Sequence, residues 1–260
     1  LIAGSVFVGR DRELAALDAA FEQTRLGRGM IVAVEGQSGV GKSALVQYWT
    51  RAVAERVADV VVLSGKYYER ETVPYRAFDG VMDALARFLM RQEAAVADAM
   101  LPVDVGLLAS LFPALRAVES VSRGTMKPPA LDPHELRQKL FAAVRELFRR
   151  LAQRRPLVLV VDDVQWSDAD SRAIFAEAMR APDGPPVLFL ATLRSVPGQE
   201  AATERVLQYL RSVNTLQHLS LAPLAPPEAR ELATRLLGRQ REALAAAIAG
   251  EAEGHPLFID

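Results

Sequence analysis

Five short apolar runs are separated by longer stretches with helical periodicity. The runs cover residues 30–34 (MIVAV), 58–63 (ADVVVL), 157–161 (LVLVV), 187–191 (VLFLA) and, more weakly, 216–221. A continuous apolar run of this length is typical of a strand that is buried on both faces, as in parallel sheets. Because helical patterns lie between the strands, we predict an α/β fold with a mainly parallel five-stranded sheet between two layers of helices.

A long helical insert is predicted between the second and third strands, over about residues 77–153. Its last helix has an N-cap at Asp132, a first-turn proline at Pro133 and a capping-box partner at Glu135. The apolar positions that follow share one helix face: Leu136, Leu140, Phe141, Val144, Leu147, Phe148 and Leu151. Residues 121–133 are rich in Pro, Ser and Gly, which predicts an exposed loop.

The C-terminal part reads as a separate unit. Residues 223–227 (PLAPP) read as a linker, and helical patterns follow at 228–237 and 242–249. We therefore predict a sheet domain over residues 1–222 and the start of a helical lid over residues 228–260. The chain begins at Leu1, and its last apolar run has no terminator, so we expect it to be part of a longer protein.

Composition narrows the function classes. The 260 residues have a formal net charge of −1, so no overall field favours nucleic acid or membrane, and we expect neither as a direct partner. No apolar run approaches the roughly 20 residues that span a bilayer. The chain has no cysteine, which excludes disulfides and fits a cytoplasmic location. Its three histidines, His134, His218 and His255, are too scattered for a metal site.

Residues 36–43 (GQSGVGKS) follow the first strand and open a helix, which is the arrangement of a phosphate-binding loop. Glycines let successive backbone N–H groups form an anion nest, and the helix N-terminus adds partial positive charge. Lys42 is expected to reach the β- and γ-phosphates, and the Ser43 hydroxyl to bind Mg²⁺. Nucleotide contacts are expected from Gly36, Gln37, Ser38, Gly39, Val40, Gly41, Lys42, Ser43 and Ala44.

Two aspartates end the third strand, at the carboxyl edge where open α/β sheets bind ligands. Asp162 is the candidate Mg²⁺ partner, through water, since Mg²⁺ dehydrates reluctantly. Asp163 is the candidate that orients or deprotonates the attacking water. An Asp-Asp pair after a strand can also cap a helix. The basic group Arg149, Arg150, Arg154 and Arg155 is more typical of a solvated helix end than of a nucleic-acid site.

Together these motifs resemble the STAND class of AAA-type ATPases. Residues 7–10 (FVGR) with Glu13 and Leu14 resemble the N-terminal motif of that class, and Gln165-Trp166 continues its metal-strand motif. The resemblance implies that the motif with Val8 and Gly9 covers the adenine, that Arg10 contacts phosphate or ribose, that Arg194 senses the γ-phosphate, and that Pro256 of the G-x-P stretch meets the base. Simpler interpretations are surface pairing of Arg10 with Asp11 or Glu13, a solvated Arg194, and a helix start at Pro256.

A narrower likeness lies in residues 65–70 (GKYYER) and 73–75 (VPY), which are similar to a stretch in bacterial multidomain serine/threonine protein kinases. The chain has no H-R-D loop and no D-F-G motif, so it is not itself the kinase. LuxR-type regulators carry a related module, although no helix-turn-helix is evident here.

The resemblance implies a signal-transduction switch that binds ATP or ADP with Mg²⁺ and hydrolyses ATP slowly through Lys42, Asp163 and Arg194. Slow turnover is expected because Asp163 replaces the usual glutamate and no arginine finger is recognisable. Expected partners are other domains of the same polypeptide or other proteins. A nucleotide-dependent oligomer is a further possibility. Two alternatives are a non-hydrolysing nucleotide-bound scaffold and a small-molecule phosphotransferase, which needs an acceptor pocket.

Overall fold

The computed structural model describes residues 6–67, 76–123 and 132–259. Most of the kinase-like stretch, residues 68–70 and 73–75, lies outside these ranges. Five strands, β1 (Met30–Gly36), β2 (Val61–Lys66), β3 (Leu157–Asp162), β4 (Val187–Arg194) and β5 (Leu216–Leu221), form one sheet in the order β2-β3-β4-β1-β5. Every neighbouring pair is parallel, which confirms the predicted fold class.

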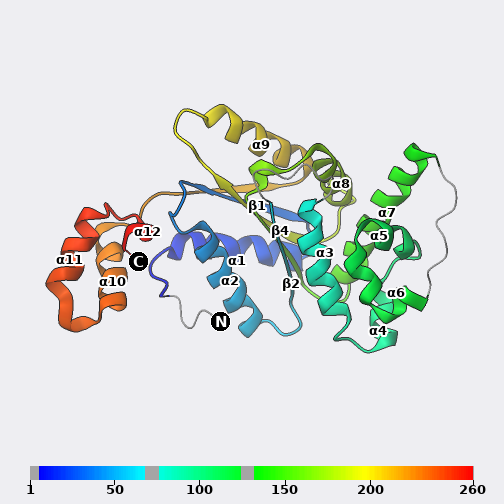
Figure 1. The fold of residues 1–260 in the computed structure, drawn as a ribbon, viewed down its shortest axis with the longest axis horizontal. Coiled ribbons are helices and arrows are strands. Elements are labelled where there is room, and N and C mark those ends of the chain that lie inside the picture. Colours follow the sequence, from blue (N-terminus) through cyan, green and yellow to red (C-terminus); the bar gives the residue numbers. More distant parts are fainter. Residues whose placement is uncertain (1–5, 68–75, 124–131, 260) are drawn as a thin grey trace.

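Alternate residues of the central strands enter two separate cores. Val32 and Val34 of β1 pack on one face with α1 (Asp11–Arg25) and α2 (Lys42–Arg56). Ile31 and Ala33 pack on the other face, with α3 (Arg76–Leu89), α7 (Pro133–Ala152), α8 (Ala169–Met179) and α9 (Glu200–Val213). Because the strands are apolar on both sides, helices cover both faces, as Figure 1 shows.

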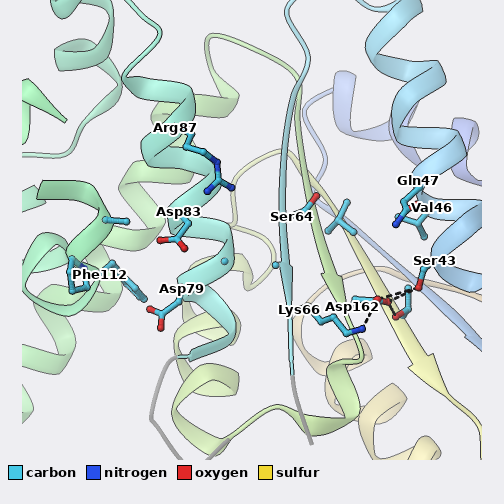
Figure 2. Close-up of a pocket in the computed structure, with 16 residues that line it drawn as sticks. Ser43, Val46, Gln47, Ser64, Lys66, Asp79, Asp83, Arg87, Phe112 and Asp162 are labelled. Carbon is cyan, nitrogen blue, oxygen red and sulfur yellow. Dashed lines mark hydrogen bonds and ion pairs between the residues drawn. The ribbon is translucent and has the colours of Figure 1, made fainter. Parts of the chain in front are cut away.

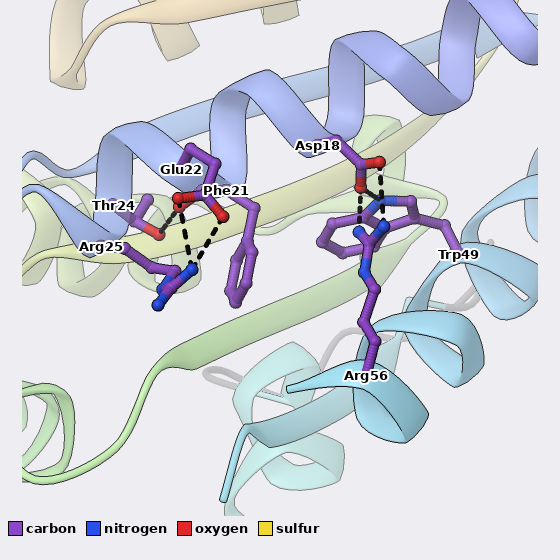
Figure 3. A network of polar contacts seen from close by, with 7 residues as sticks. All are labelled: Asp18, Phe21, Glu22, Thr24, Arg25, Trp49 and Arg56. Carbon is purple, nitrogen blue, oxygen red and sulfur yellow. Dashed lines mark hydrogen bonds and ion pairs between the residues drawn. The ribbon is translucent and has the colours of Figure 1, made fainter. Parts of the chain in front are cut away.

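The α1 and α2 helices are joined by a polar contact at the edge of their core. The indole of Trp49 is buried, and its Nε1 donates to Asp18 Oδ1 at 2.7 Å. The guanidinium of Arg56 binds the same carboxylate, with Nη1 3.0 Å from Oδ2 (Figure 3). Burial acts to raise the pKa of Asp18, but hydrogen bonds from Arg56 and Trp49 outweigh it, so the pKa lies below its usual value.

The insert between β2 and β3 contains α3, α4 (Ala94–Met100), α5 (Val105–Leu111), η1 (Pro113–Ala117), α6 (Glu119–Arg123) and α7. Asp132 caps α7 as predicted, accepting from the backbone N–H groups of His134 and Glu135 at 2.9 and 3.0 Å. Within the described residues no single helix is long and apolar enough to cross a membrane. The pair α4 and α5 meets the length and composition together but is bent by 88°.

The C-terminal helices α10 (Pro226–Leu237), η3 (Arg239–Arg241), α11 (Glu242–Glu251) and α12 (Pro256–Ile259) lie at one end of the molecule, away from the insert (Figure 1). They share a small core of their own, which Val8 of the N-terminal segment joins. Together with the sheet, these elements position the N-terminal segment beside the first helix of the lid. The division into two domains stays a prediction.

Some predicted boundaries are wrong. The 223–227 linker is shorter than predicted, because Pro226 and Pro227 open α10, where a missing N–H costs nothing. The predicted 121–133 loop overlaps α6 at its start and the first residue of α7 at its end, and residues 124–131 lie outside the described ranges. Leu136 is exposed, since it lies in the first turn of α7 beyond the core, and Glu135 pairs with Lys139 at 3.5 Å.

Candidate nucleotide-binding site

The loop between β1 and α2 leaves its amides open to an anion. Gly39 and Gly41 have φ angles of 79° and 99°, a region that residues with a side chain rarely adopt. Gly41 caps α2 without a side-chain hydrogen bond, and the first turn of α2 carries no acidic residue. The positive end of this 15-residue helix is therefore not neutralised by its own sequence and suits a phosphate group.

Lys42 lies inside the loop. Its side chain is only 8% exposed, and Nζ donates to the backbone oxygens of Gly36 and Gln37 at 2.9 and 2.8 Å. Burial lowers the pKa of Lys42, Arg194 adds to this effect, and the carboxylates of Asp163 and Asp162 oppose it. A bound phosphate would compete with these two carbonyls for Nζ.

Ser43 and Asp162, which the sequence predicts as metal ligands, lie in contact. Ser43 Oγ is 3.2 and 3.1 Å from the two oxygens of the Asp162 carboxylate. A hydroxyl and a carboxylate are the oxygen donors that Mg²⁺ prefers, so this pair fits the ion. Among the described residues no group of three or more acids or histidines could hold a metal, so water and phosphate would complete the coordination.

Thr192 of β4 joins the two acids. Its Oγ1 donates to Asp162 Oδ1 and accepts from the backbone N–H of Asp163 at 2.9 Å. The side chain is buried. Sequence reasoning missed this residue, although its signal is a single hydroxyl in the otherwise apolar run VLFLATL.

Asp163 is held in a left-handed conformation, with φ 59° and ψ 45°. Gln165 Nε2 donates to Asp163 Oδ1 at 2.9 Å, and Gln165 Oε1 accepts from the backbone N–H of Arg194 at 3.2 Å. Lys66, which sequence reasoning also missed, lies with Nζ 3.8 Å from an oxygen of each acid. Its signal is positional, because Lys66 ends β2 opposite Asp162 in the register.

Arg194 ends β4 opposite Gly36 of β1, so the strand register brings it to the phosphate-binding loop. Its side chain is exposed. Its charge contributes to the lowered pKa of Lys42. This position is compatible with contact to a γ-phosphate, a role that stays a prediction.

Arg10 is nearly buried and connects three segments. Its guanidinium donates to the backbone oxygens of Ala222 at 2.6 Å and Val40 at 3.3 Å, and lies 3.5 Å from Glu13 Oε1. The predicted pairing with Glu13 is therefore present, but it is largely buried and not at the surface, and the shorter contacts of Arg10 are to the loop and to the segment before the lid. Here Arg10 positions the loop, and direct contact with nucleotide stays a prediction.

Gly9 and Pro256 lie against other parts of the chain, and their contact with the adenine base stays a prediction. Gly9 has a φ of 62°, and a Cβ added there would lie 2.2 Å from Glu228 of α10. Pro256 opens α12 and lies against Gly41, since an added Cβ on Gly41 would be 3.8 Å from its Cγ. Thus Pro256 is both a helix start and a neighbour of the phosphate-binding loop.

A cavity of about 710 Å³ lies beside the Ser43–Asp162 pair. Figure 2 shows Asp79, Asp83 and Arg87 on α3 across from Lys66 and Asp162. On one side of the cavity α3 packs closely against β2, because a Cβ added to Gly80 would lie 2.9 Å from the Cα of Gly65. The cavity therefore runs from the metal pair to the helical insert.

Comparisons with known proteins agree with this geometry. Residues 6–190 match the family model described as AAA ATPase domain. The chain is 27% identical over 274 residues to an uncharacterised protein of Rhizobium meliloti, covering 99% of this chain and 25% of that protein. The chain thus spans about a quarter of the length of this curated relative.

Several solved structures are similar. The ORC2 protein of Aeropyrum pernix, solved in ADPNP–ADP complexes, is 14% identical with a TM-score of 0.50 over 100% of this chain and 62% of that chain. A STAND protein with a tetratricopeptide repeat sensor from Pyrococcus horikoshii is 16% identical with a TM-score of 0.49, covering 98% and 29%. RuvB of Thermotoga maritima is 16% identical with a TM-score of 0.49, covering 97% and 60%. The ORC2 similarity supports the fold alone, a P-loop NTPase type.

Proposed function

We propose, because this chain belongs to the AAA ATPase domain family, that it binds ATP or ADP with Mg²⁺ and serves as a slow, nucleotide-dependent switch in a larger regulatory protein. The family is the one expected from the sequence. The observation that carries the proposal is the junction of three features: an open helix N-terminus, a buried Lys42 and the contact between Ser43 and Asp162.

Hydrolysis is supported by the arrangement around Asp163. Its carboxylate accepts a hydrogen bond from Gln165 and lies near Lys66. It therefore lies at the same edge of the sheet as Ser43 and Asp162, the two candidate metal ligands. A fixed carboxylate at this edge can hold the attacking water for transfer to the γ-phosphorus. When bound, Mg²⁺ would stabilise the charge that develops on the phosphate. Slow turnover is proposed because the ammonium group of Lys66 lies near both carboxylates and competes with Mg²⁺ and water for them.

A larger protein is supported by the length of the Rhizobium relative, of which this chain spans 25%. A bacterial serine/threonine protein kinase is the context that residues 65–75 favour, and a LuxR-type regulator is the alternative. The nucleotide would act within either protein by changing how the lid packs on the sheet.

The first test is nucleotide affinity. Lys42→Ala should weaken ATP binding about ten- to a hundredfold, since it removes a charge-assisted contact worth roughly 1.5–3 kcal/mol. Lys139→Ala, which removes the same charge on α7, is the matched control. Calorimetry that finds equal affinity in Lys42→Ala and the parent would contradict the proposal.

Phosphate release is the measurement that distinguishes a non-hydrolysing scaffold from the proposed switch. A scaffold would bind ATP with the same dependence on Lys42 but release no phosphate, even in the full-length protein. Phosphate release above that of the Lys42→Ala variant would exclude it.

A specific observation favours a second candidate, phosphoryl transfer to a small acceptor. The cavity beside Ser43 and Asp162 has the position that an acceptor pocket requires, and it carries Asp79 and Asp83. The carboxylates of Asp79 and Asp83 would suit an acceptor with an amino or hydroxyl group, although the cations of Lys66 and Arg87 share the cavity. ADP formation that rises severalfold when such an acceptor is added, with no matching rise in free phosphate, would identify this activity. We rank it below the switch, because only the cavity supports it.

A further inference from the structure

A second groove lies at the end of β4, next to Arg194. Its volume is about 460 Å³, and it lies between η2 (Val164–Trp166), α8, the end of β4 and α9. The side chains that define it are Trp166, Arg172, Arg194, Val196, Arg205 and Tyr209. We refer to it as the arginine groove.

The described residues that line the arginine groove include three arginines and no acid, so the groove is positively charged. Within the described ranges, Arg194 and Arg205 make no side-chain hydrogen bond or ion pair. Arg172 donates to the backbone oxygen of Ser167, a neutral group. Among the described residues that line the groove, three cations therefore lie together with no carboxylate.

The acids on the neighbouring helices are engaged elsewhere. On α9, Glu204 pairs with Arg211 at 2.7 Å, and Glu200 accepts from the backbone N–H of Gly198 at 2.9 Å. On α8, Asp170 pairs with Arg137 at 3.3 Å. None of these three acids contacts an arginine of the groove.

The arginines at the end of α7 differ from those of the groove, because several of them pair with acids. Arg149 and Arg150 at the end of α7 both pair with Glu146 at 2.6 Å, and Arg155 pairs with Asp59 at 2.8 Å. The arginines of the groove have no such partner among the described residues, so their charges remain available to an anionic ligand.

The rim of the groove is apolar. Trp166 is 39% exposed and Val196 is 38% exposed, so two large hydrophobic side chains face solvent beside the arginines. Tryptophan and arginine together are the residues most enriched at the energetic centres of protein interfaces. A ligand that satisfied both features would carry carboxylates next to an apolar side chain.

We propose that the arginine groove binds an acidic peptide segment of a partner protein. Its carboxylates pair with Arg194, Arg205 and Arg172, and an adjacent apolar side chain packs on Trp166 and Val196. The charge complementarity sets the identity of the occupant, since a basic or neutral segment would leave three arginines unpaired.

Arg194 couples this groove to the nucleotide, a step that rests on the proposed function. Arg194 lines the groove, and its charge also acts on Lys42 in the phosphate-binding loop. Gln165 bonds both the Asp163 carboxylate and the Arg194 backbone. One guanidinium therefore serves either a γ-phosphate or a peptide carboxylate. ATP weakens peptide binding, ADP does not, and by reciprocity the peptide weakens ATP binding by the same factor.

The test uses a fluorescein-labelled peptide of alternating glutamate and leucine, and the same peptide with glutamine in place of glutamate. Anisotropy at low salt without nucleotide should show the glutamate peptide binding at least tenfold tighter. Arg205→Ala should weaken it about two- to fivefold, whereas Arg230→Ala, which removes the same charge from α10, should not. Equal binding of the two peptides, or no effect of Arg205→Ala, overturns the proposal. Tighter binding of a single-stranded oligonucleotide also overturns it.

Measuring peptide binding with each nucleotide distinguishes a failure of this proposal from a failure of the proposed nucleotide-binding function. A non-hydrolysable ATP analogue should weaken the glutamate peptide several-fold more than ADP does, and Arg194→Ala should remove that difference. Equal peptide affinity with the two nucleotides, while both bind, overturns the coupling. Unchanged ATP affinity in Lys42→Ala would instead contradict the proposed function, and peptide binding without nucleotide would be unaffected by it.

Discussion

The hydroxyl of Thr192 contacts both acids of the site, Asp162 and Asp163, and helps to hold them in position. It donates to Asp162 and accepts from the N–H of Asp163, so one buried side chain fixes a carboxylate and a backbone turn together. The turn needs this support because Asp163 has a positive φ, which is costly for a residue with a side chain.

Thr192→Val keeps the shape of the side chain and removes the hydroxyl. We expect the free energy of unfolding to fall by about 1–3 kcal/mol, because a buried N–H and a carboxylate oxygen lose their partner. Phosphate release should fall as well, since both acids move. Thr192→Ser is the matched control and should retain most of both properties in urea unfolding and in a steady-state assay. Equal behaviour of the valine and serine variants would contradict this role.

The acid pair gives a second residue-scale prediction, which separates binding from turnover. Asp163→Asn should keep nucleotide affinity and lower phosphate release by about a hundredfold or more, the usual effect of losing a general base. Asp162→Asn should instead weaken the Mg²⁺ dependence of ATP binding. Asp170→Asn, an acid on α8 outside the site, controls for charge alone. Parent-like turnover in Asp163→Asn would place the base elsewhere.

The residues near the phosphate could be predicted from sequence only where a local motif specifies them. Lys42 and Ser43 follow from glycine spacing within eight residues, and Asp162 follows from the end of an apolar strand. Thr192 and Lys66 could not be predicted, because they reach the acids through strand register across β2, β3 and β4. Without the sheet order, nothing in the chain indicates which strand ends are neighbours.

At the scale of elements, the contact between α1 and α2 holds the helix that carries Lys42 and Ser43. Asp18 accepts from the buried indole of Trp49 and from the half-exposed guanidinium of Arg56 (Figure 3). The two bonds differ in value. An ion pair this exposed is worth about 0–1 kcal/mol, whereas a buried donor left without an acceptor costs about 1–3 kcal/mol.

Asp18→Ala should therefore lower the free energy of unfolding by about 1–3 kcal/mol. Asp18→Asn should lower it less, since the amide oxygen can still accept from Trp49. The pKa of Asp18 is lowered in the folded state, so its charge adds stability above its ordinary pKa of 3.8, which is lost as the pH falls through the lower folded value. Urea unfolding at neutral and acidic pH should show the parent and Asp18→Asn converging only at acidic pH. A constant gap at all pH values would assign the difference to packing.

Helix identity was more predictable than helix boundaries. The Asp132 cap of α7 was read correctly because its signal is local, whereas Pro226 and Pro227 were assigned to a linker. Proline is compatible with both a linker and a first helical turn, and only the packing of Ala229 and Leu232 in the small core selects the helix.

At the scale of the whole molecule, the lid and the phosphate-binding loop share a contact surface. A Cβ added to Gly39 would lie 2.8 Å from both His255 and Leu257, and Arg10 joins Val40 of the loop to Ala222 before the lid. The sequence indicated a lid but not this contact, which joins residues more than 200 positions apart. A shift of the loop on binding phosphate would therefore be felt directly by α12.

This surface leads to the last prediction, that ADP holds the lid against the sheet and ATP reorients it in the full-length protein. A ligand shifts this balance only by the difference in its affinity for the two arrangements. The γ-phosphate alone distinguishes ATP from ADP, and Arg194 lies where it can sense that group. The 260 residues have no cysteine, so Leu26→Cys after α1 and Leu236→Cys on α10, both exposed, give two labels for distance measurements once any cysteine elsewhere in the full-length protein is replaced by serine. Distances should differ between ADP and a non-hydrolysable ATP analogue, and Arg194→Ala should abolish the difference while leaving ADP affinity nearly unchanged. Identical distributions with the two nucleotides would rule the reorientation out.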